Sequence, residues 1–142
     1  MKPSWFYDCA VDDFARGDLD WERDPVNVML VTDDYQPSQA KDETVAAVKR
    51  YEVETSGVYQ AGGVELPDRD VVRRSVGGHT LDAGRVEWET FTGQFRYAVA
   101  YRQDTGRLIG CADMGRQEAT DAKVTIDYGR DGFGEFANEV AF

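Results

Sequence analysis

The stretch Phe95-Arg96-Tyr97-Ala98-Val99-Ala100-Tyr101 decides the fold class of this 142-residue chain. Its large apolar side chains fall on every second residue, which is the period of a β-strand with one face in the core. The preceding stretch Arg85–Thr90 alternates in the same way, with apolar residues inward and glutamates outward. Asp104-Thr105-Gly106 then predicts a hairpin turn, and residues Arg107–Ala112 return as the partner strand.

Strand patterns continue on both sides of this hairpin. Val26–Val31 is apolar at nearly every position, so we expect a central strand with both faces covered. The other patterns lie at Tyr59–Val64, Val71–Val76, Thr80–Leu81, Lys123–Tyr128 and, as a final edge strand or tail, Glu135–Phe142. About seven short strands separated by Gly and Asp turns are typical of an antiparallel β-sandwich.

One or two short helices are predicted to accompany the mostly β fold. A helix over residues 8–17 begins at Asp8, a good N-cap residue, and ends at Gly17. A second, weaker pattern over residues 42–50 predicts a helical insert, with valine and alanine side chains on its buried side.

The chain has the size and composition of one domain, residues 1–142. We divide it into an N-terminal arm (1–7), the helix (8–17) and a β-sandwich (26–142). Hydrophobic residues make up 42% of the chain, enough for a core of normal size. No apolar run approaches the ~20 residues of a membrane span, so we expect no membrane contact.

The chain is strongly acidic. Asp and Glu total 27 against 16 Lys and Arg, which gives a net charge of −11. Affinity for nucleic acid depends largely on cationic side chains, so we expect no nucleic-acid partner. Few lysines and many aspartates fit two sources equally: a salt-loving organism, in which salt screens the repulsion between charges, or a host of high genomic GC content.

Side chains that carry catalysis or hold metals are scarce or scattered. His79 is the only histidine and lies in a glycine-rich stretch that predicts a turn, so any catalytic triad has one available base. Cys9 and Cys111 lie far apart and in no metal-ligand spacing. We expect two separate buried thiols, with a disulfide as the alternative.

The acidic and glycine-rich motifs also lack the form of a known site. Carboxylate pairs such as Asp33/Asp34 arise by chance among 27 acids, and Leu66–Asp70 and Asp127–Asp131 are only fragments of calcium loops. Gly129–Gly134 does not have the form of a phosphate-binding loop. We therefore predict a non-enzymatic protein with no cofactor and no metal.

Aromatic residues near the two ends of the chain are the remaining signal. They are Trp5, Phe6, Tyr7, Phe133, Phe136 and Phe142. Chain ends usually lie at the surface, and aromatic side chains are common interface anchors, so these six are predicted to contact a partner or another copy. The alternative is that they cover the domain's own core.

Eight short motifs follow one another along nearly the whole chain. They are Phe14–Asp18, Val26–Asp33, Tyr59–Gly63, Val86–Phe91, Phe95–Tyr101, Asp104–Gly106, Leu108–Gly110 and Val124–Asp127. Their order and spacing resemble a family of small virion structural proteins of tailed bacteriophages and related tailed viruses. The departures from that pattern are the helical insert at Asp42–Tyr51 and the acidic bias.

The resemblance implies a structural part of a virion that is assembled in the host cytoplasm. A capsid decoration (cement) protein, which binds the outer surface of the viral head and clamps neighbouring copies of the major capsid protein, fits a small β-sandwich. The resemblance also implies a homo-oligomer, with a trimer favoured. The alternatives are a tail or baseplate accessory protein, a carbohydrate-binding module with exposed Trp and Tyr, and a hydrolase with Asp or Glu pairs.

Overall fold

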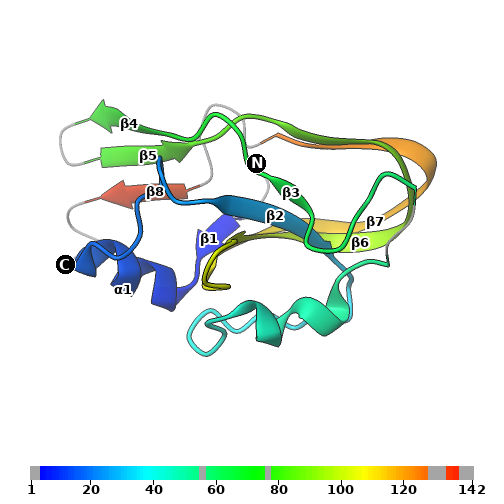
Figure 1. Cartoon of the computed structure of the whole chain (residues 1–142), viewed down its shortest axis with the longest axis horizontal. Helices are drawn as coiled ribbons and strands as arrows, with labels where there is room; N and C mark the ends of the chain where they lie inside the picture. The colour runs from blue at the N-terminus through cyan, green and yellow to red at the C-terminus, as the bar shows by residue number, and fades with distance from the viewer. Residues whose placement is uncertain (1–3, 55–56, 76–77, 128–133, 138–142) are drawn as a thin grey trace.

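The computed structural model describes residues 4–54, 57–75, 78–127 and 134–137. Over these residues the chain is mostly β, with two antiparallel sheets arranged like a sandwich and one α-helix near the N-terminus (Figure 1). The predicted fold class is confirmed. No described helix is long and apolar enough to cross a membrane.

The two sheets differ in size. The larger sheet has the strand order β1-β7-β6-β2-β3, from β1 (Ser4–Phe6), β7 (Leu108–Ile126), β6 (Val86–Arg102), β2 (Val26–Val31) and β3 (Val64–Glu65). The smaller sheet has the order β4-β5-β8, from β4 (Asp70–Ser75), β5 (Gly78–Asp82) and β8 (Gly134–Ala137). Strand β8 lies at the predicted final edge strand; the rest of that prediction, beyond residue 137, is outside the described residues.

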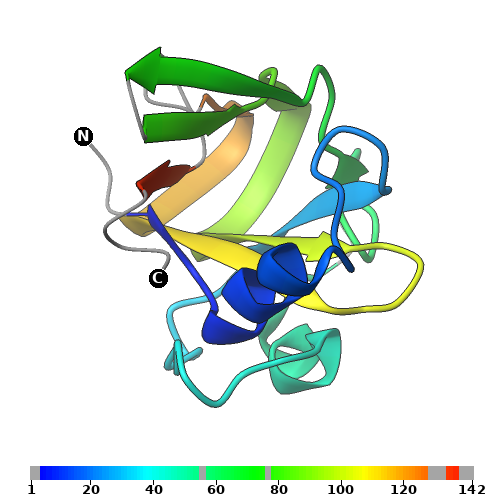
Figure 2. The same cartoon turned by 90° about the vertical axis from the view of Figure 1, so that its left-hand side faces the viewer.

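Strands β6 and β7 form one long hairpin that reaches both layers. The patterns at residues 85–90 and 95–101 belong to a single 17-residue strand, and β7 likewise joins two predicted strands into one of 19 residues. Three register shifts between Trp88 and Tyr97 interrupt their pairing. Such bulges bend a strand without ending it, and the ribbon curves up toward the β4–β5 hairpin (Figures 1 and 2).

The larger sheet is covered on both faces, as Val26–Val31 predicted. Val28 and Leu30 point into the main core cluster, together with the aromatic residues of β6. Met29 and Val31 point the other way, into a second cluster on the outer face. The segment that follows β2 covers this outer face. Strand β2 is therefore almost fully buried, as expected for a central strand.

The insert predicted as a helix over residues 42–50 contains two 3-10 turns, Val45–Ala47 and Lys49–Tyr51. Its backbone is bonded elsewhere: the Val45 N–H donates to Gly106 at 2.8 Å, and the Glu43 carbonyl accepts from Leu108 at 2.9 Å. In an α-helix over residues 42–50 the Glu43 carbonyl would accept a bond from within the helix, so its bond to Leu108 replaces a helical one.

Helix α1 (Asp8–Arg16) ends as predicted at Gly17, whose φ of 77° is left-handed. Its start differs from the prediction. Tyr7 is the N-cap residue and makes no side-chain cap bond, while Asp8 lies in the first turn, where its charge favours the positive end of the helix dipole.

The described part of the predicted arm over residues 1–7 consists of a strand of the larger sheet and Tyr7, which joins that strand to α1. Residues 4–6 form β1, which pairs with β7 in the register Trp5 to Cys111. The ring of Phe6 lies in the main core cluster and that of Tyr7 in the outer cluster. The arm prediction is wrong for residues 4–7, because burial of these two rings holds the segment on the edge of β7.

Candidate binding surface

Of the six predicted contact residues, the structure describes the side chains of Trp5, Phe6 and Tyr7. Tyr7 is fully buried and Phe6 is 9% exposed, so their rings serve the chain's own core. Trp5 is half-buried, and its ring meets that of Tyr7 edge-on at 4.8 Å between centroids. Of these three residues, Trp5 alone is not buried.

The C-terminal aromatic residues are described only in part. Phe136 lies in β8, where its backbone faces His79 of β5. Phe133 and Phe142 lie outside the described residues. The predicted role of these three residues as partner contacts stays a prediction.

His79 lies in strand β5 and faces Arg73 of β4, so the predicted turn at this histidine is wrong. The glycine-rich stretch suggested a turn, but pairing on both sides makes β5 the central strand of the smaller sheet.

The two cysteines are separate buried thiols, as predicted. Burial raises the pKa of the Cys111 thiol to about 12, which makes it a poor nucleophile.

The clearest acidic cluster is engaged in ion pairs. Arg96 donates to Asp33 at 2.9 Å and to both oxygens of Asp113 at 3.0 Å. Hydrogen bonds from Arg96 hold the pKa of both carboxyl groups below the usual range. Within the described ranges, no group of three or more His, Cys, Asp or Glu residues is placed to hold a metal ion.

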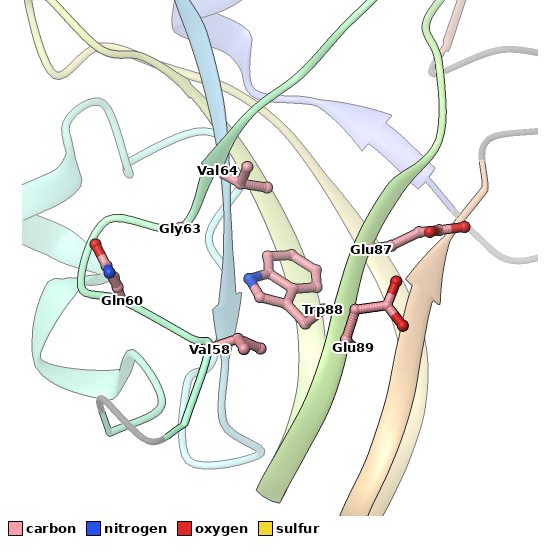
Figure 3. Close-up of a pocket in the computed structure, with 7 residues that line it drawn as sticks. All are labelled: Val58, Gln60, Gly63, Val64, Glu87, Trp88 and Glu89. Carbon is pink, nitrogen blue, oxygen red and sulfur yellow. The ribbon is translucent and has the colours of Figure 1, made fainter.

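A hollow of about 280 Å³ lies between the loop before β3 and the first half of β6 (Figure 3). It is lined by Val58, Gln60, Gly63, Val64, Glu87, Trp88 and Glu89. Trp88, with 4% of its surface exposed, forms the floor of the hollow, and the side chains of Val58 and Val64 point toward the indole (Figure 3).

The loop is held in place by the carboxylate of Glu52. Its Oε2 accepts from the Tyr59 hydroxyl at 2.7 Å and from the Gly62 N–H at 2.6 Å. The Tyr59 oxygen in turn accepts from the Leu30 N–H at 3.1 Å. Burial raises the pKa of Tyr59, so this hydroxyl stays protonated and keeps its bond to Glu52.

The wall of the hollow is apolar and unusually exposed. Val58 is 47% exposed and Val64 is 37% exposed, and among the large hydrophobic residues of the described chain only Val71 of β4 joins them as exposed. A second hollow, of about 520 Å³, follows β7 from Met114 to Ile126, but none of its large apolar side chains is exposed. The smaller hollow is therefore the better binding candidate.

Charges border the hollow on the β6 side. The carboxylates of Glu87 and Glu89 turn away from Trp88 toward β7 (Figure 3), where Lys123 lies 3.4 and 3.9 Å from them. Arg85 lies 3.8 Å from Glu87. The hollow itself is therefore apolar, with carboxylates at its rim.

The sequence did not point to Val58 and Val64 as a surface. Their only signal is their position on either side of the Gly62–Gly63 pair, and Tyr59–Val64 was predicted as a strand. Trp88 was correctly predicted to point inward, but the opening beside it depends on the path of the loop.

Comparisons with protein-family models, curated proteins and solved structures found no match for this chain.

Proposed function

We propose that this chain is a non-enzymatic structural component of a virion, and that it decorates the outer surface of the viral head. The observation that carries the proposal is the exposed apolar hollow at Val58 and Val64, placed on a two-sheet scaffold in a chain of net charge −11. A rigid sheet that exposes a small apolar patch on an otherwise acidic chain suits docking to a larger assembly.

The order of the motifs supports the same role. Four of them, Val26–Asp33, Phe95–Tyr101, Leu108–Gly110 and Tyr59–Gly63, form the centre of the larger sheet and the loop that is locked onto β2. These segments build a scaffold. The segment around 42–51, which departs from the family pattern, covers the outer face of the sheet and lies outside this scaffold.

A carbohydrate-binding module is less well supported. Sugar rings stack on exposed aromatic faces, but Trp21 and Trp88 are only 2% and 4% exposed. Among the described tryptophans, this leaves Trp5, which is half-buried.

A tail or baseplate position would use the same docking geometry, so copy number has to separate it from a head position.

Cryo-electron microscopy of the particle tests the proposal directly. We expect density for a small β-sandwich at the symmetry axes of the head, and a copy number comparable to that of the major capsid protein on quantitative gels. Density confined to the tail, with few copies, would move the chain to the tail. Absence of the chain from purified particles would reject a virion role.

A further inference from the structure

We propose that the hollow at Val58, Val64 and Trp88, together with the free edge of β3, receives an extended segment of a partner protein. That segment carries one large apolar side chain flanked by Lys or Arg. The inference rests on the proposed function, because the partner would be another protein of the virion. It commits to strand addition at one edge of the larger sheet.

The first step is the hydrogen bonding of β3. Val28 faces Val64, and the Leu66 N–H donates to the Val26 carbonyl at 2.8 Å. Hydrogen-bonded pairs alternate along an antiparallel ladder, so Val28 and Val64 also form such a pair, and Glu65 lies between them and Leu66. The backbone N–H and C=O of Glu65 therefore point away from β2.

The second step is that this edge is open. Strand β3 is the last strand of the larger sheet, and in the described part of the chain no other strand pairs with its outer side. Unpaired edges are templates for an added strand. A segment that bonds to the outward groups of Glu65 would pass directly beside Val64.

The third step is the size of the hollow. At about 280 Å³ it lies just below the usual range of small-molecule sites, roughly 300–1,000 Å³, and suits a single large side chain. Val58 and Val64 would lose their exposed surface against that side chain, and Trp88 would form its floor.

The fourth step is charge. The carboxylates of Glu87 and Glu89 lie at the rim of the hollow, and Lys123 and Arg85 offset them only in part, because Arg85 also pairs with Asp127 at 3.2 Å. A second copy of this chain would bring a further net charge of −11. A basic segment is complementary to this rim, whereas another copy would be repelled.

The test measures fluorescence anisotropy of labelled peptides with the intact chain. The probe is Lys-Thr-Arg-Phe-Arg-Thr-Lys, and the comparison peptides replace Phe by Ala, or every Lys and Arg by Glu. We expect the basic Phe peptide to bind at least about tenfold more tightly than either comparison peptide, because each lacks one of the two required contacts. Methylating the backbone nitrogens that point to one edge of the peptide should abolish binding. Methylating those that point to the other edge should leave binding unchanged.

The matched variants are Val64→Asp and Val71→Asp. Both valines are similarly exposed, at 37% and 40%, and each lies on an edge strand, but Val71 belongs to the other sheet. Val64→Asp should weaken binding of the basic Phe peptide at least about tenfold, and Val71→Asp should leave it unchanged. Thermal melts of both variants establish that each is folded.

Three results would overturn the inference. The first is that the unaltered chain does not bind the basic Phe peptide, and the second is that the two variants bind it equally well. The third is that Val64→Asp changes the oligomer mass without changing peptide binding. The last result would identify another copy as the occupant. None of them bears on the position in the virion, which the reconstruction decides. Peptide binding by a chain that is absent from the particle would reject the virion role and keep the peptide site.

Discussion

At the scale of single residues, Gly63 lies where the loop before β3 meets β2, with φ at +76°. A Cβ added there would lie 1.8 Å from the Val28 carbonyl oxygen, a distance at which the backbone must move. The Tyr59–Gly63 motif is thus a structural requirement: Tyr59 bonds to β2 and Gly63 lets the loop approach it.

We predict that Gly63→Ala lowers the free energy of unfolding by about 3–5 kcal/mol, because it adds a backbone clash to a left-handed conformation. Gly17→Ala is the matched control. Gly17 also has a left-handed φ, +77°, but an added Cβ would meet nothing within 4 Å, so the cost should be about 1 kcal/mol. Urea unfolding measures both; similar losses for the two variants would contradict the role given to the Val28 contact.

The sequence identified this motif but not its conformation. A strand broken by two glycines is the natural interpretation of Tyr59–Val64, since aromatic and β-branched residues favour strands. Left-handed φ values at Gly62 and Gly63 produce a loop instead. The carboxylate that holds the loop, Glu52, lies seven residues before Tyr59, and periodicity does not reveal such a bond.

At the scale of elements, β1 is the feature whose role changes most. It was predicted as part of an N-terminal arm over residues 1–7, with packing on the domain's own core as the alternative for its aromatic residues. It is an edge strand whose last ring, Phe6, enters the core and is followed by the buried Tyr7. Aromatic composition alone does not distinguish an anchor for a partner from an anchor for the chain itself. The pairing with β7, about a hundred residues away in sequence, decides it.

We predict that deleting residues 1–7 lowers the free energy of unfolding by at least about 4 kcal/mol, because truncating one buried aromatic side chain costs about 3–5 kcal/mol. Since typical domains have about 5–15 kcal/mol of stability, the truncated chain should be partly or wholly unfolded. Trp5→Ala is the control, because Trp5 is half-buried and its loss should leave the fold intact. Circular dichroism melts measure both, and a truncated chain with an unchanged melting midpoint would restore the arm interpretation.

Element boundaries were predicted correctly where the sequence pattern was local. Residues Val26–Val31 form the predicted central strand, and Gly17 ends the predicted helix. The continuity of β6 was not predictable, because the alternation shifts by one residue between Trp88 and Phe91, where the pairing with β7 also shifts register. The insert at 42–50 was predicted as helical from its apolar spacing, but hydrogen bonds to the β6–β7 turn, more than 50 residues away, set its conformation.

At the scale of the whole molecule, charge is the dominant property. Because the net charge is −11, the acidic side chains repel one another across the surface. Ion pairs such as Arg96 with Asp33 and Asp113 act against that repulsion. Exposed pairs contribute only about 0–1 kcal/mol each, so the summed repulsion should dominate the response to salt. Docking to a basic partner would relieve the same repulsion locally.

We predict that the free energy of unfolding rises as KCl increases from about 0.01 M to about 1 M, because the screening length falls from about 30 Å to about 3 Å. A variant with Asp18→Asn, Asp34→Asn and Glu54→Gln removes three exposed charges and changes the net charge from −11 to −8. It should be more stable than the unaltered chain at low salt and gain less from KCl. Chemical denaturation at each salt concentration measures the effect. Stability that falls with KCl would show that the ion pairs around Arg96 outweigh the repulsion, and would remove the physical basis for a salt-loving source.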